Sequence, residues 1–301
     1  MRVLLTTDGS SGAAAATQTA CRILRAESRQ IDLLCVSPEY RPRMTGWDEG
    51  RAGKLYKQRI LAETKRILGE AEAVLGAEGV EVRKRTEVGS PQGVIVRESA
   101  GYDLTVLGAK GRGAHSEAGL GPVANHVLHH AAGSVLIGRE LHSDSGFRVL
   151  VAVDGSTASG RALDAMTSFL DLESADITLM HVVETPWIHL GLEREWLRFK
   201  DPVHDQIEPE IEWDKEVRIE AQRVIDRARE QLRPHHPGFE VELAEGVPAY
   251  EILSEAEKRD CDLIVLGATG VTDLKHQFLG SVSYRIAWNA SCSVLVVRAA
   301  D

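Results

Sequence analysis

Glycines recur in the two halves of this chain with the spacing of a loop that cradles phosphate groups. In the second half, Gly267-Ala-Thr-Gly270 precedes nine residues and then Gly280-Ser281. In the first half, Gly108-Ala-Lys-Gly111 precedes nine residues and then Gly121-Pro122. Each block follows a short apolar run, and a glycine-rich turn between a buried strand and a helix presents backbone N–H groups to an anion. The pattern predicts phosphate binding, with one copy changed at its last position.

Each half also carries a carboxylate that can complete a nucleotide site. Asp8 ends the first apolar run within an Asp-Gly-Ser sequence, and Asp154 does the same in the second half. In an open parallel sheet whose order reverses beside the first strand, the ends of the first and fourth strands meet at a crevice. A carboxylate there can accept hydrogen bonds from ribose hydroxyls or an adenine edge.

The elements that position these residues are duplicated. The offset between the copies is 146 residues at the two aspartates and 159 residues at the glycine blocks, so the second copy is longer, with its extra residues after Val182. Solenoid repeats run to about 20–50 residues, so this repeat is a duplicated domain. We expect an N-terminal domain at residues 1–142 and a C-terminal domain at residues 147–301.

Short apolar runs alternate with longer amphipathic stretches, which predicts an α/β fold. The runs are continuous rather than alternating, as expected for parallel strands covered on both faces. Strands are expected near residues 2–7, 31–36, 80–86, 103–108 and 134–138, and again near 147–153, 176–183, 238–244, 262–267 and 293–298. In the first copy, helices are expected near 11–26, 52–77, 91–100 and 122–132. We therefore predict two tandem Rossmann-like domains, each a five-stranded parallel sheet of order 3-2-1-4-5 with helices on both faces.

Composition and charge narrow the class of protein. Hydrophobic residues make up 43% of the chain and charged residues 27%, as in ordinary soluble domains. The net charge of -10 and the lack of a long basic block argue against nucleic-acid binding. No apolar run approaches the roughly 20 residues of a membrane span, and we expect no signal peptide. Four cysteines without a C-x-x-C pair favour reduced core thiols in a cytoplasmic protein: Cys21, Cys35, Cys261 and Cys292.

The G-x2-G-x9-G-S block, together with Asp-Gly-Ser at the end of the first strand, resembles the universal stress protein family in its ATP-binding branch. The resemblance covers nearly the whole chain as two tandem copies, and the stretch from Leu279 to Arg298 is especially typical. Ser293 departs from the proline that usually follows Cys292 in that family. The resemblance implies ATP as the ligand, with or without Mg²⁺.

The resemblance also implies which residues form the site in the second copy. Asp154 and Val182 would surround the adenosine. The ribose and phosphate chain would be lined by Gly267, Ala268, Thr269 and Gly270. The phosphates would be held by Gly280, Ser281, Val282 and Ser283, with both serine hydroxyls able to face them.

The first copy matches less completely. Its counterparts are Asp8, Val36, Gly108, Gly111 and Gly121. Pro122 removes a hydroxyl and a backbone donor, and Ala124 replaces the second serine. Pro122 is also a good first residue of a helix. We predict a degenerate first site that is empty or weak.

Three functions remain open. The first is a nucleotide-binding regulatory protein of the stress response that acts as a switch or sensor on an unknown protein partner. The second is a slow ATP-hydrolysing enzyme with residues 184–212 as a lid, although no catalytic residue is evident. The third is a scaffold with remnant loops, which the intact Ser281 block argues against. His126 and His130 are spaced for a metal, but without a third ligand we predict no metal site.

The final strands of the two copies suggest how the domains assemble. Residues 134–138 and 293–297 are short and apolar and lie at a sheet edge in the expected order. An exposed apolar edge pairs readily with another strand. We expect the copies to pack through these strands as an intramolecular pseudo-dimer, with a homodimer of chains as a further alternative.

Overall fold

The computed structural model describes residues 1–25, 30–39, 51–77, 79–113, 119–141, 146–184, 208–270 and 279–299. The strands are β1 (Arg2–Thr6), β2 (Gln30–Ser37), β3 (Val82–Val88), β4 (Leu104–Gly108), β5 (Ser134–Gly138), β6 (Phe147–Ala152), β7 (Ala175–Val183), β8 (Phe239–Glu245), β9 (Leu263–Gly267) and β10 (Ser293–Val297). The helices are α1 (Ser11–Ile23), α2 (Arg51–Ala77), α3 (Pro91–Ser99), α4 (Pro122–His130), α5 (Thr157–Phe169), α8 (Glu208–Leu232), α9 (Pro248–Lys258) and α10 (Ser281–Asn289).

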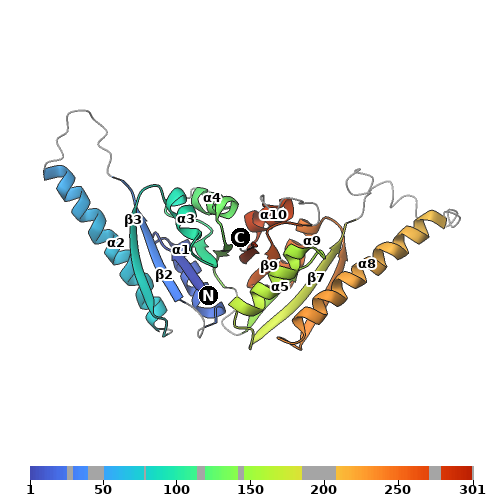
Figure 1. Cartoon of the computed structure of the whole chain (residues 1–301). Helices are drawn as coiled ribbons and strands as arrows, with labels where there is room; N and C mark the ends of the chain where they lie inside the picture. The colour runs from blue at the N-terminus through green and yellow to red at the C-terminus, as the bar shows by residue number, and fades with distance from the viewer. Residues whose placement is uncertain are drawn as a thin grey trace.

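All ten strands form one sheet of order β3-β2-β1-β4-β5-β10-β9-β6-β7-β8. Neighbouring strands are parallel within each half, and β5 and β10 pair antiparallel with Leu136 opposite Leu295. The predicted α/β fold of two tandem halves is confirmed, as is the contact through the last strands. The two five-stranded sheets are not separate, because this junction joins them edge to edge (Figure 1).

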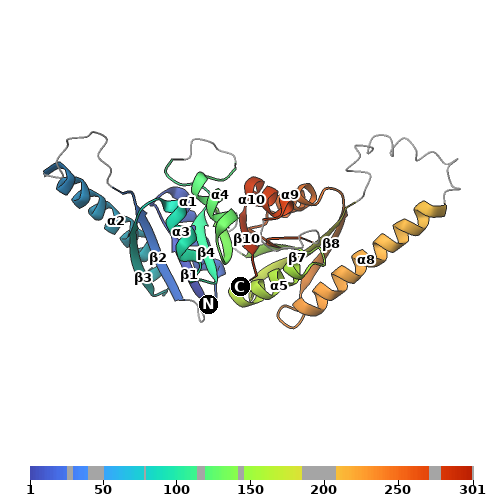
Figure 2. The same cartoon turned by 45° about the horizontal axis from the view of Figure 1, so that its top comes forward.

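Helices cover both faces of the sheet, and each face has its own hydrophobic core. One core lies between the sheet and α1, α2, α5 and α8, and the other lies beneath α3, α4, α9 and α10. Both cores contain residues of both halves. Figure 2 shows α4 and α10 side by side at the centre, with α2 and α8 at opposite ends of the molecule. No described helix combines the length and apolar character of a membrane span.

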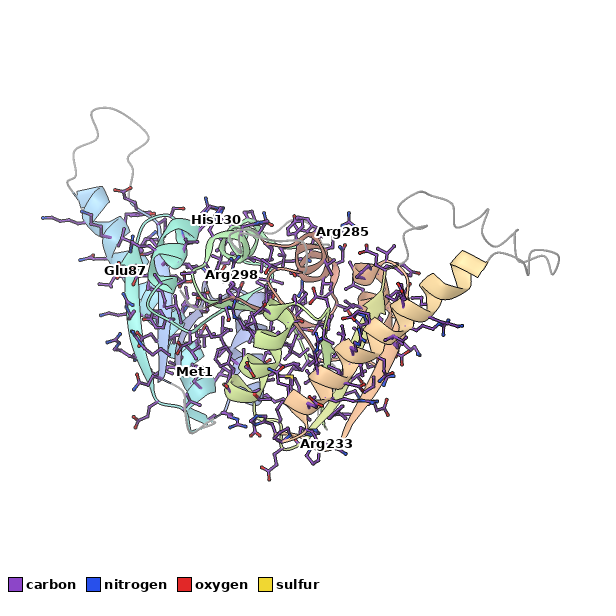
Figure 3. The ribbon with its side chains drawn as sticks, turned by 45° about the vertical axis from the view of Figure 1, so that its right-hand side comes forward. Met1, Glu87, His130, Arg233, Arg285 and Arg298 are labelled. Carbon is purple, nitrogen blue, oxygen red and sulfur yellow. The ribbon has the colours of Figure 1, made fainter. Side chains whose placement is uncertain are left out.

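Two arginines fasten the halves together reciprocally. Arg139 follows β5 and donates to the carbonyls of Ala287 (2.7 Å) and Cys292 (2.9 Å) in the second half. Arg298 follows β10 and donates to the carbonyl of Leu128 in α4 (2.7 Å), and Figure 3 shows it beside that helix. Burial lowers the pKa of Arg139 to about 10. Each guanidinium therefore binds carbonyls near the end of the other half's last helix, where a cation is favourable.

A second contact between the halves shortens the first helix relative to the prediction of 11–26. The helix ends at Ile23, because Leu24 forms an antiparallel bridge with Leu170. The backbone of Arg25 donates to the Phe169 carbonyl (3.0 Å). Such a long-range pairing overrides local helix propensity. Of the 184–212 insert, residues 185–207 lie outside the described residues and 208–212 belong to α8.

Candidate functional site

A cleft with a volume of about 900 Å³ opens at the carboxyl ends of the second-half strands. The predicted residues that line it are Asp154, Val182, Gly267, Thr269, Gly270, Gly280, Ser281, Val282 and Ser283. Ala268 is buried beside the cleft instead, and its carbonyl accepts a hydrogen bond from the Gly280 N–H (2.7 Å). This bond fixes the start of α10 against the loop that follows β9.

Asp154 is held at the edge of this cleft by its own turn. Its Oδ1 accepts from the Ser156 N–H (2.9 Å), and Ser156 Oγ accepts from the Ser159 N–H (3.1 Å) as the N-cap of α5. A Cβ added at Gly270 would lie 3.0 Å from Asp154 Oδ2. The glycine loop therefore passes directly against the carboxylate, and the first-strand and fourth-strand ends meet at the cleft.

The start of α10 offers backbone donors to the cleft. Gly280 is the N-cap and supplies no side-chain hydrogen bond, while its carbonyl accepts from Tyr284 N–H (2.9 Å). The N–H groups of Ser281, Val282 and Ser283 belong to the first turn, where an α-helix has no internal acceptor for them. Together with the helix dipole, they form a site suited to an anion.

The Ser283 hydroxyl differs from expectation. It is buried and donates to the Gly267 carbonyl (2.7 Å), so its proton does not face the cleft. Ser281 is exposed at the first position of the helix. Ser283 therefore positions α10 on β9, and Ser281 carries the hydroxyl available to a ligand.

The first-half cleft has the same place in the fold but only about 300 Å³ of volume. It is lined by all the predicted counterparts: Asp8, Val36, Gly108, Gly111 and Gly121. Gly121 donates to the Ala109 carbonyl (2.8 Å), as Gly280 does in the second half. Pro122 and Ala124 line this cleft where the second half has serines, so the first turn of α4 offers one N–H fewer and no hydroxyl.

Arg112 of the first half donates hydrogen bonds to two carboxylates of the chain itself. Its N–H donates to Asp8 Oδ2 (3.0 Å), and its Nη2 donates to Glu63 Oε1 on α2 (3.1 Å). The Asp8 Oδ1 accepts from the Ser10 N–H (3.0 Å). Hydrogen bonds from Arg66 and Arg112 lower the pKa of Glu63 to about 2. The Asp8 carboxylate therefore already accepts hydrogen bonds from the chain, where a ligand would otherwise donate them.

The sequence profile described as the universal stress protein family matches residues 1–139 and again residues 147–298. The chain belongs to this family. Universal stress protein YxiE of Bacillus subtilis is 32% identical over 155 residues, which are 50% of this chain and 98% of YxiE. A universal stress protein of Mycolicibacterium smegmatis is 25% identical over 304 residues, covering 98% of this chain and 96% of its own.

Solved structures show the same fold. A universal stress protein from Archaeoglobus fulgidus DSM 4304 aligns with a TM-score of 0.63 at 20% identity, covering 99% of this chain and 98% of that one. The structural alignment spans nearly the whole of both chains, and the family match occurs once in each half. The tandem arrangement therefore extends over the whole chain.

The sequence analysis missed residues that line the second cleft on the face of the sheet covered by α8. His181 lines the cleft from β7, and its Nδ1 lies 2.7 Å from the Val153 carbonyl, which can only accept, so this nitrogen carries a proton. Glu220 and Arg227 line the cleft from α8. The repeat could have indicated His181, which matches Cys35, whereas the α8 residues depend on how a long helix lies on the sheet. Burial raises the pKa of the Cys35 thiol to about 11.

Among the described residues, no group of three or more His, Cys, Asp and Glu side chains is arranged to hold a metal ion. The rings of His126 and His130 lie 4.5 Å apart on α4, and His129 contacts Tyr284 of α10 across the halves (5.1 Å). His129 therefore takes part in the contact between α4 and α10, and none of the three histidines lines either cleft.

Proposed function

We propose that this chain is an ATP-binding regulatory protein of the universal stress protein family, with one nucleotide in the second-half cleft. The observation that carries the proposal is that one cleft of about 900 Å³ is lined both by Asp154 and by the first turn of α10, whose N–H groups have no acceptor within the helix. A carboxylate suits the hydroxyls or amino group of a nucleoside, and the helix start suits its phosphates. Any Mg²⁺ would be carried by the phosphates, its usual partners.

Binding rather than turnover is the proposed role. Stabilising the charge that develops on a transferred phosphoryl group usually needs lysine, arginine or metal at the phosphate end. Among the described residues that line the cleft, Arg227 is the only lysine or arginine. It lies on α8 and not at the start of α10. ATP would join the Asp154 turn to α10 and alter the surface offered to a protein partner. ATP hydrolysis below about one per minute is expected.

The test begins with mass spectrometry of small molecules released from the denatured protein, which should identify ATP. Calorimetric titration of the emptied protein should then give one ATP per chain. Gly280→Val should abolish binding, because its side chain would crowd the Ala268 carbonyl, which lies 3.3 Å from a Cβ. Gly121→Val is the matched control, since a Cβ there lies 3.4 Å from Lys110. Binding that survives Gly280→Val and fails in Gly121→Val would refute the proposal.

A further inference from the structure

Three histidines lie close together on α4, and one of them reaches the other half of the chain. The ring centroids of His126 and His130 are 4.5 Å apart, and those of His129 and His130 are 6.2 Å apart. The ring of His129 lies 5.1 Å from that of Tyr284 on α10. A cluster of imidazoles, the side chains that change charge between pH 5 and 8, therefore adjoins the contact between the halves.

Arg298 of the second half lies at the same end of α4 (Figure 3). Its Nη2 donates to the carbonyls of Leu128 (2.7 Å) and His129 (3.2 Å), and its buried Nε has no hydrogen-bond partner among the described residues. The last turn of a helix usually favours a positive charge. Here the guanidinium already binds carbonyls of that turn, so an imidazolium at His129 would add a second charge where one is already held.

The elements packed on α4 were searched for an acid that could offset this charge. The described parts of β4 and β5 carry no titratable side chain, and α10 contributes Tyr284 and Arg285. The α3 carboxylate Glu98 is already paired with Arg85 (2.6 Å) and Arg97 (2.9 Å). The surroundings of the cluster are therefore neutral or positive wherever the structure describes them.

The titration of His129 reflects these surroundings. A tyrosine ring can attract a cation. Burial of His129, followed by the positive charges of the neighbouring histidines and Arg298, nevertheless lowers its pKa below the ordinary value of 6.5. The folded protein therefore holds this imidazole neutral at a pH where the unfolded chain already binds the proton.

We propose that the histidine cluster of α4 is a proton-sensitive contact that weakens the joining of the two halves in mild acid. Protonation would place a charge on His129 between Arg298 and the other histidines, and like charges on neighbouring turns of a helix repel. Because the folded pKa is depressed, the stabilisation is complete above about pH 6.5 and is lost as the pH falls through the folded pKa. The inference does not depend on what either cleft binds.

The first experiment follows the imidazole protons of the full chain by NMR during a pH titration. The signal that disappears in His129→Gln should have a midpoint below 6.5. The double variant His126→Gln/His130→Gln should raise that midpoint, because two like charges are removed. His235→Gln, in the exposed turn after α8, is the matched control and should leave it unchanged. A midpoint at or above 6.5 in the wild-type protein would overturn the proposal.

The second experiment measures amide hydrogen exchange at the junction. Between about pH 7.5 and about pH 5.5, protection in β5 and β10, corrected for intrinsic exchange, should fall about threefold or more, while the outer strands β3 and β8 keep theirs. Carboxylates such as Glu98 do not interfere, because their ordinary pKa of 4.5 lies below this range.

The variants assign that loss of protection to the cluster. His129→Gln should remove most of the pH dependence at the junction, and His235→Gln should retain it. If His129→Gln folds poorly at both pH values, His126→Gln/His130→Gln provides the same test and should lose less protection than the wild-type protein. An unchanged pH dependence in the folded variants, or an equal loss in β3 and β8, would refute the assignment.

Discussion

The two clefts of this chain have the same backbone frame and different contents. Both have an Asp-Gly-Ser turn, a glycine loop and a helix whose N-cap glycine donates to the loop carbonyl (2.8 Å at Gly121 and 2.7 Å at Gly280). In the first cleft, Arg112 binds Asp8 and Glu63, and Pro122 begins the helix. The difference teaches that the glycine loop can be kept for its role in the fold while the side chains around it differ.

The largest effect is expected from a substitution that separates the two halves at the junction of β5 and β10. Leu295 of β10 is fully buried opposite Leu136 of β5. Leu295→Lys would bury an unpaired charge, so we expect a loss of at least about 3 kcal/mol in the free energy of unfolding. Denaturant titration followed by two probes should show separate transitions.

The control for that variant is Leu243→Lys on the outer strand β8, where the side chain is 45% exposed. It should leave one transition with an unchanged midpoint. Equal effects of the two substitutions would mean that the junction does not couple the halves.

The next effect sharpens the comparison at the aspartates. Asp154→Ala should lower ATP affinity about 10–150-fold, the worth of a hydrogen bond to a charged acceptor. Asp8→Ala should leave ATP affinity unchanged, because Arg112 already uses that carboxylate. Calorimetry on both variants checks this, with melting temperatures to show that both are folded. Unchanged affinity in folded Asp154→Ala would leave Asp154 as a turn residue only.

A smaller effect tests whether the first cleft can be rebuilt. Pro122→Ser and Ala124→Ser restore the hydroxyls and an N–H, and Arg112→Ala removes the internal cation. The triple variant should bind a second ATP, about tenfold or more weakly than the first, because this cleft remains narrower. Calorimetric stoichiometry near two is the expected result, and a value of one would show that other features close the site.

The smallest effect concerns the two serine hydroxyls at the start of α10, which have no counterpart at the start of α4. Ser283→Ala should cost about 1 kcal/mol of stability, since it removes the buried hydrogen bond to the Gly267 carbonyl. Ser281→Ala should leave stability unchanged and weaken ATP binding by about threefold. Thermal unfolding and calorimetry would separate the two roles, and reversed results would contradict the assignment.

Local patterns were enough to predict most of the frame. Continuous apolar runs located the inner strands, and the first helix was predicted from residue 11, where α1 begins at Ser11. The outer strands β3 and β8 carry charged residues on their exposed face, and they were predicted two residues and one residue too early. The end of α1 at Ile23 could not be predicted, because it depends on pairing with Leu170 far along the chain. Pro122 was a visible difference in the glycine block, whereas the position of Arg112 over Glu63 requires knowing where α2 lies.

The antiparallel junction of β5 and β10 has a consequence for how the two clefts could diverge. A dimer of identical chains must carry the same residues at both of its sites, so a mutation that improves one alters the other. Here the two halves are encoded separately and remain fastened by Arg139 and Arg298. Covalent fusion therefore lets a substitution change one cleft and leave the other as it is.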